Sequence, residues 1–119
     1  MVFYDRSGSP EAYMEKDDDT FFSFGGVPQA YLYSDAVYSF TGKQLGWFRS
    51  GWIRDLQGKC VFFTESTEGF GPIKPIRRVC PVKSVRQIKP IKAVREVMRV
   101  RPIDNLQWSS LSGNVFFDQ

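Results

Sequence analysis

Branched aliphatic residues recur at every third position from Ile73 to Ile103 without interruption. This period does not suit an α-helix, around which the aliphatic stripe would rotate by about 60° per step, or a β-strand, whose side chains alternate with a period of two. Polyproline II has three residues per turn and tolerates proline. The aliphatic series is Ile73, Ile76, Val79, Val82, Val85, Ile88, Ile91, Val94, Val97, Val100 and Ile103, and Pro75, Pro81, Pro90 and Pro102 share another position of the repeat. We therefore predict that residues 73–103, which we call the basic arm, form a polyproline-II-like segment whose aliphatic edge is buried.

The position after each aliphatic residue is mainly cationic. Residues 1–72 have a net charge of −4, residues 73–103 of +9 and residues 104–119 of −2, which gives +3 in total. We expect the acidic front half to neutralise the basic arm, within one subunit or between subunits. The alternative is that the cations bind nucleic acid or acidic lipid with a steep salt dependence, although no nucleic-acid-binding motif is present. The candidate binding residues are Lys74, Arg77, Lys83, Arg86, Lys89, Lys92, Arg95 and Arg101.

The length of the basic arm limits where it can lie. As polyproline II, residues 73–103 would span about 96 Å, whereas a domain of this size has a radius of gyration of only ~13–14 Å. The arm must therefore turn, wrap around the rest of the chain, or reach onto another subunit in an arm-exchanged homo-oligomer. A disordered basic tail is disfavoured, because such tails are poor in valine and isoleucine.

The front half of the chain is a repeat. Gly26, Gly42 and Gly58 are 16 residues apart and Gly8 precedes them by 18. The fifth residue after each glycine is a large aromatic one: Tyr13, Tyr31, Trp47 and Phe63. Turn residues that alternate with short aromatic and β-branched runs are typical of β-hairpins. We predict a single all-β domain with four antiparallel hairpins in residues 1–68, a linker at 69–72, the basic arm, and a closing hairpin or strand in residues 104–119 that hides the N-terminal edge.

Both faces of the predicted hairpins are partly apolar. Phe3, Phe21, Val37 and Ile53 lie on one face, while Tyr4, Phe22 and Tyr38 lie on the other. A meander alone would leave one of these faces in water. We therefore expect the aliphatic edge of the basic arm to cover the second face.

The hairpin sequence Val37-Tyr38-Ser39-Phe40-Thr41-Gly42-Lys43-Gln44-Leu45-Gly46-Trp47-Phe48 is followed later by Gly71-Pro72-Ile73-Lys74-Pro75-Ile76. With these motifs the chain resembles the bacterial proteins described as having a four-fold β-flower domain. The resemblance covers most of the chain and implies four hairpins set as petals about a pseudo-four-fold axis. It implies no activity, cofactor or functional residues.

Three groups of residues are candidates for a site. Asp5, Ser23, Ser39 and Asp55 occupy one repeat column and would form a polar or ion-binding centre if they meet near one axis, but short polar residues also satisfy backbone groups at turns, which is the interpretation we favour. Asp17, Asp18 and Asp19 with Glu15 lack the spacing of an EF-hand and are interpreted as a solvated loop or a docking point for the arm. The column Tyr13, Tyr31, Trp47 and Phe63 is a stacking ladder or, as we favour, core.

The composition argues against an enzyme. The 119 residues include no histidine, the commonest general base and metal ligand, and we find no nucleophile–base pair, metal cluster or phosphate loop. We expect no catalytic residue, metal or cofactor. No export signal or transmembrane run is recognisable, so we expect a cytoplasmic protein in which Cys60 and Cys80 are free thiols.

Overall fold

The computed structural model describes residues 1–69 and 71–119, and its main element is a closed antiparallel barrel of eight strands in chain order. Consecutive strands pair with each other, and β1 closes the barrel on β8 through Tyr4 and Phe63. The strands are β1 (Val2–Tyr4), β2 (Pro10–Tyr13), β3 (Thr20–Phe22), β4 (Pro28–Tyr33), β5 (Ala36–Tyr38), β6 (Gln44–Arg49), β7 (Trp52–Asp55) and β8 (Cys60–Phe63). The prediction of an all-β protein is confirmed.

The pairs β1–β2, β3–β4, β5–β6 and β7–β8 share one irregularity. In each pair the register shifts after the second residue of the first strand, for example between Val37 and Tyr38. Such a bulge bends the strand and redirects a side chain. The glycine of each connecting turn has a positive φ, which reaches 94° at Gly42, a conformation that glycine adopts without steric cost.

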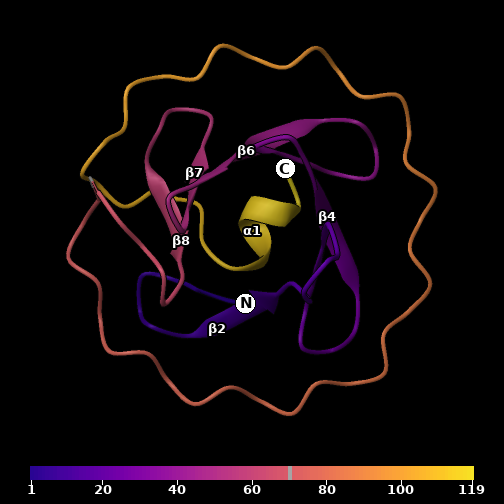
Figure 1. The fold of residues 1–119 in the computed structure, drawn as a ribbon, viewed down its shortest axis with the longest axis horizontal. Helices are drawn as coiled ribbons and strands as arrows, with labels where there is room; N and C mark the ends of the chain where they lie inside the picture. The colour runs from indigo at the N-terminus through magenta and orange to yellow at the C-terminus, as the bar shows by residue number, and fades with distance from the viewer. Residues whose placement is uncertain (70) are drawn as a thin grey trace.

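The interior of the barrel is filled by aromatic and aliphatic side chains. Phe3, Phe21, Val37 and Ile53 are at most 1% exposed, as expected for the inner face of the first strand of each pair. The short helix α1 (Asn114–Phe117) lies in the centre of the barrel when it is viewed down its short axis (Figure 1). Phe117 stacks on Phe62 with ring centroids 5.6 Å apart.

The predicted closing strand at the C-terminus is therefore wrong. Residues 114–117 are helical and plug the barrel, and only Trp108 forms a β-bridge in this region, to Cys60. The physical reason is that β1 and β8 already pair with each other, so the barrel offers no edge to close. The two phenylalanines instead pack in the apolar centre of the barrel.

Aromatic side chains also form an outer layer on the barrel. Tyr13, Tyr31, Trp47 and Phe63 are only 1–2% exposed, and rings of neighbouring strands contact one another, as in the stacked pair Tyr13 and Phe22. The four side chains of this column are buried, so they do not form an open stacking surface. Residues 71–105 form neither helix nor strand and run around the outside of this layer as a ring (Figure 1).

Candidate functional site: the basic arm

The basic arm contacts the barrel with a period of nine residues. Four backbone N–H groups, each nine residues after the last, donate to the carbonyl oxygens of the four turn glycines at 2.8–3.1 Å. The pairs are Arg78 with Gly8, Gln87 with Gly26, Glu96 with Gly42, and Asn105 with Gly58. Three turns of the three-residue repeat therefore correspond to one hairpin of the barrel.

The arm also approaches the turn glycines so closely that no side chain fits between them. A Cβ atom on Gly26 would overlap the carbonyl oxygen of Val85, and one on Gly42 would overlap that of Val94. Ile76 and Ile103 lie in the same way over Gly8 and Gly58. The glycine at each turn thus serves the positive φ and the close approach of a second backbone.

A second set of hydrogen bonds explains some of the residues at the third position of the repeat, which proline occupies elsewhere in the arm. Ser84 N–H donates to the Phe24 carbonyl and Ala93 N–H to the Phe40 carbonyl, at 2.8 and 2.9 Å. Ser84 and Ala93 therefore lie at positions where the backbone N–H is a hydrogen-bond donor. Pro75 lies nine residues before Ser84 and Pro102 lies nine residues after Ala93, and neither proline has an N–H to donate.

The cations of the arm face the barrel. Ion pairs join Arg77 to Glu65, Lys83 to Glu15, Lys89 to Asp18, Lys92 to Asp19, and Arg101 to Asp104, at 2.7–3.3 Å. Of the other predicted binding residues, Lys74 donates to the Thr67 hydroxyl, and the guanidinium groups of Arg86 and Arg95 lie over the rings of Phe22 and Tyr33. The loop with Glu15, Asp18 and Asp19 receives three of the lysines.

Lysine side chains cover aromatic faces as well as pairing with carboxylates. The ammonium groups of Lys83 and Lys92 lie 4.3 and 4.4 Å from the ring centroids of Tyr13 and Tyr31. Such cation–π contacts contribute about 0.5–1 kcal/mol at exposed sites. Burial alone would raise the pKa of Asp18, but hydrogen bonds from Lys89 and from the backbone N–H groups of Asp19 and Thr20 outweigh it and lower that pKa.

The predicted burial of the aliphatic edge is wrong. All eleven valines and isoleucines of the series, from Ile73 to Ile103, are 90–94% exposed. The reason is what the barrel presents on its outside: aromatic faces and carboxylates, which bind cations, and turn carbonyls, which bind N–H groups. With those two edges of the arm turned inward, the aliphatic edge points into water. We call these eleven side chains the outer rim.

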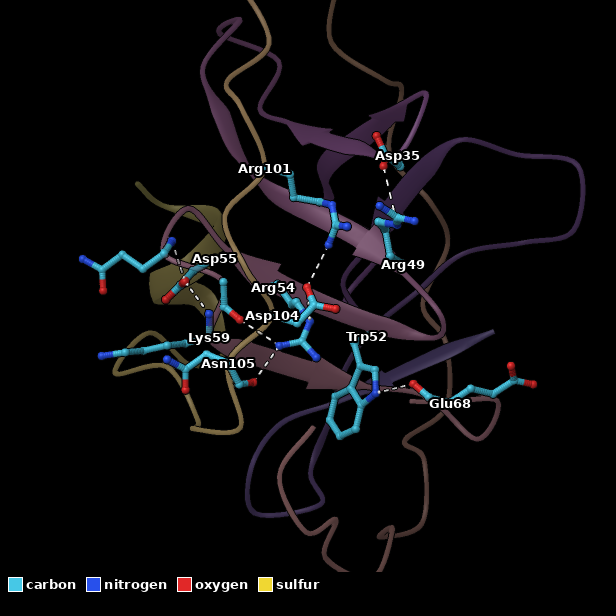
Figure 2. A network of polar contacts seen from close by, with 12 residues as sticks. Asp35, Arg49, Trp52, Arg54, Asp55, Lys59, Glu68, Arg101, Asp104 and Asn105 are labelled. Carbon is cyan, nitrogen blue, oxygen red and sulfur yellow. Dashed lines mark hydrogen bonds and ion pairs between the residues drawn. The ribbon is translucent and has the colours of Figure 1, made fainter. Parts of the chain in front are cut away.

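The fourth hairpin departs from the pattern through Arg54, which the sequence reasoning did not select. Its side chain is 4% exposed, its Nε lies 3.4 Å from Asp104, and its Nη1 donates to the carbonyls of Gly58 and Asn105 at 2.7 and 2.8 Å (Figure 2). In the repeat Arg54 takes the position of Tyr4, Phe22 and Tyr38, and Asp104 takes the position of an arm cation. At this hairpin a cation therefore lies on the strand, and a carboxylate lies in the segment that follows the arm.

The predicted polar centre consists of four turn residues that bond their own turns. Asp5 accepts from the N–H groups of Ser7 and Ser9, and Asp55 from those of Gln57 and Lys59, at 2.8–3.0 Å. The Ser23 hydroxyl accepts from Val27 N–H and that of Ser39 from Lys43 N–H. Asp55 also accepts from the Ser109 hydroxyl at 2.6 Å. All four residues thus satisfy backbone N–H groups of their own turns.

Burial raises the pKa of several titratable groups, among them Cys60, Glu11 and Tyr4. Burial raises the pKa of the Cys60 thiol to about 11. Burial and a hydrogen bond with Asp5 raise the pKa of Glu11 to about 7. Burial also raises the pKa of Tyr4, as does its hydrogen bond with the thiol of Cys80, 3.6 Å away. Both cysteines are free, with Cys60 buried and Cys80 exposed.

Among residues 1–69 and 71–119, no group of three or more cysteine, aspartate and glutamate side chains is placed to hold a metal ion. In the same part of the chain, no helix is long and apolar enough to cross a membrane. The fold and its ring define a class of protein: a small closed barrel encircled by an extended segment. The family model described as 4-fold beta flower protein matches residues 1–117, so the chain belongs to this family. Comparisons with curated proteins and with solved structures find no match.

Proposed function

We propose that this protein is a non-enzymatic structural or protein-interaction module in which the basic arm docks on its own barrel. The observation that carries the proposal is the shared register of the two parts. The chain advances nine residues for each turn glycine, and at each one the arm, or Asn105 just after it, supplies an N–H donor while an arm carbonyl lies over the glycine. This agreement at four successive turns supports four equivalent hairpins that are held by one continuous segment.

The length of the arm supports docking in cis. At ~3.1 Å per residue, residues 73–103 in polyproline II conformation span about 96 Å, close to the circumference of a ring about 30 Å across. The principal extents of 36 and 35 Å accommodate such a ring. Its two ends return to the same hairpin, because Gly71 lies against the Trp52 ring and Asn105 binds Gly58. An arm-exchanged oligomer is the variant of this proposal in which a second subunit receives the arm.

The alternative function is an anion binder that presents the cations of the arm to nucleic acid or acidic lipid. The contacts of the cations favour the structural role. Five of the eight candidate residues pair with carboxylates, and the other three contact a hydroxyl or an aromatic ring. An anionic ligand would have to compete with partners that the chain already supplies.

Two matched triple variants separate these functions. Each removes three positive charges from the full chain, either within the arm or outside it. The arm set is Lys83→Gln, Lys89→Gln and Lys92→Gln, and the control set is Lys16→Gln, Lys43→Gln and Lys59→Gln. We expect the arm set to lower the free energy of unfolding by about 1–3 kcal/mol, since each lysine makes one ion pair and one cation–π contact. The control set should lower it by less than about 0.5 kcal/mol.

Urea unfolding followed by tryptophan fluorescence measures both differences. Equal stability of the two triple variants would contradict docking of the arm. The anion-binding alternative is tested on the same proteins by fluorescence anisotropy with a labelled oligonucleotide at two salt concentrations, because binding through phosphates falls steeply with salt. Deletion of residues 73–103 should leave an unfolded or insoluble remainder, and a stable monomeric fragment 1–72 would refute the proposal.

A further inference from the structure

The outer rim is an apolar feature that faces water. Its eleven side chains are 90–94% exposed, and the arm that carries them runs around the outside of the barrel as a ring (Figure 1). Large exposed apolar surfaces on soluble proteins mark interaction sites. Since full burial of a valine or isoleucine is worth ~1.5–3 kcal/mol, a partner that follows the rim would gain a large driving force.

The convex shape of the rim restricts what that partner can be. The ring lies on a molecule 36 by 35 Å in cross-section, and neighbouring rim residues are about 9 Å apart along an extended chain. A flat or convex partner, such as the edge of a second copy, would touch about three of them. An extended polypeptide that curves with the ring can contact many more.

The backbone and charge of the arm also suit an extended polypeptide. Among the described residues, the N–H groups of the eleven rim positions donate to no atom of the chain, so they are free to bind carbonyl oxygens of a partner. Four arm cations lie outside the ion pairs found in the same part of the chain: Lys74, Arg78, Arg86 and Arg95. A partner that complements this surface carries carboxylates next to aliphatic side chains.

One segment of the rim borders a surface cavity that is suited to anchor a ligand. A surface cavity of about 530 Å³ opens between the arm and the β4–β5 pair. It is lined by Tyr33, Tyr38, Lys92, Ala93, Val94, Arg95, Glu96, Val97 and Met98. The Glu96 carboxylate already pairs with Arg99 and accepts from the Gln44 N–H, so the two cations Lys92 and Arg95 give the cavity a net positive charge. The Arg95 guanidinium lies 3.7 Å from the centroid of the Tyr33 ring, which is 48% exposed. Its hydrogen bond to the Tyr31 hydroxyl is long, at 3.5 Å, so its other donors can face a carboxylate. Val94 and Val97 flank this site on the rim.

We propose that the outer rim binds an extended polypeptide segment with aliphatic and acidic residues, anchored where a carboxylate meets Arg95 in this cavity. The segment lies along the arm, places its aliphatic side chains between those of the rim, and accepts hydrogen bonds from the free N–H groups. The peptide is thus recognised by main-chain hydrogen bonds and side-chain contacts along an extended surface. The inference rests on the proposed function, because the rim exists only when the arm is docked on the barrel.

The experiment uses the full chain and fluorescein-labelled peptides made of six repeats of Val-Pro-Glu, followed by fluorescence anisotropy. Two peptides of equal length serve as controls: Ser-Pro-Glu repeats keep the charge and remove the apolar side chains, and Val-Pro-Lys repeats reverse the charge. We expect saturable binding of the Val-Pro-Glu peptide and at least tenfold weaker binding of both controls. Failure of the Val-Pro-Glu peptide to bind at millimolar protein, or equal binding of Ser-Pro-Glu repeats, overturns the proposal.

Variants localise the site. Val94→Ser with Val97→Ser should weaken binding about tenfold or more, and Arg95→Gln about tenfold. Val79→Ser with Val82→Ser is the matched control away from the anchor and should weaken binding less. Equal effects of the two valine pairs would overturn the anchor. Because the side chains of Val79, Val82, Val94 and Val97 are 90–94% exposed, the melting temperature of both valine variants should stay unchanged, which keeps this comparison independent of the stability measurements on the lysine variants. Protein that self-associates with rising concentration, or that binds anionic vesicles instead of the peptide, would assign the rim to a second copy or to lipid and refute the inference.

Discussion

Replacing Gly42 by alanine tests whether the arm holds the turn glycines in addition to their own backbone conformation. Gly42 has φ of 94°, and an L-residue at positive φ costs about 1–2 kcal/mol. The new Cβ would also overlap the carbonyl oxygen of Val94. The arm must then move away from the turn, and the hydrogen bonds from Ala93 to Phe40 and from Glu96 to Gly42, at 2.9 and 2.8 Å, are stretched or broken.

The magnitude follows from these two parts. Each lost hydrogen bond is worth about 0.5–1.5 kcal/mol, so Gly42→Ala should lower the free energy of unfolding by about 2–5 kcal/mol in total. Gly69 provides a matched control because its φ is 72° and no atom lies within 4 Å of a Cβ built there. Gly69→Ala should therefore cost only the conformational part, about 1–2 kcal/mol.

Urea unfolding monitored by tryptophan fluorescence measures both losses by linear extrapolation. Limited trypsin digestion under native conditions gives an independent result, since a displaced arm exposes bonds after its lysines and arginines. We expect Gly42→Ala to be cleaved within residues 73–103 faster than Gly69→Ala. Equal losses of stability together with equal cleavage would refute the reasoning that the arm seals the turns.

Three further predictions concern buried or perturbed groups. Asp104→Ala should lower the free energy of unfolding by about 1–3 kcal/mol, because the buried Arg54 loses its carboxylate, and adding Arg54→Leu should recover part of that loss; additive losses in the double variant would contradict this. The pKa of Glu11 is raised from 4.5 to about 7 by burial and by Asp5, so the folded state binds the proton more tightly than the unfolded state and stability should fall as pH rises from about 4.5 to about 7. Glu11→Gln should remove this part of the pH dependence, and an unchanged profile would assign it elsewhere. The Cys60 thiol, buried and with a pKa of about 11, should resist alkylation in the native protein and react in urea, as mass spectrometry of digested peptides would reveal; rapid native labelling of Cys60 would contradict the packing around β8.

Much of the architecture was predictable because it rests on local chemistry. Glycines at a spacing of 16 with a short polar residue three positions before them specify turns, and the runs between them have strand composition. The family resemblance, drawn from the hairpin motif and the start of the arm, is confirmed by the match over residues 1–117.

The site was only partly predictable. Charge separation along the chain identified the selected cations, and in the structure they contact carboxylates, a hydroxyl or aromatic rings of the same chain. Arg54 was missed because its role depends on Asp104, fifty residues away. One available signal was overlooked: Lys74, Lys83, Lys92 and Arg101 repeat every nine residues, which matches the arm to the hairpins.

By itself, the sequence predicted an extended segment over residues 73–103 with three distinct edges, because a three-residue turn keeps the aliphatic residues together. It did not determine which edge faces inward. That was decided by the outer surface of the closed barrel, whose rings, carboxylates and turn carbonyls bind cations and N–H groups more favourably than aliphatic side chains. The same holds for Val115, Phe116 and Phe117, which have the composition of a strand but become a helix. Strand pairing between β1 and β8 removes the edge they would need, and the apolar centre of the barrel takes the phenylalanines instead.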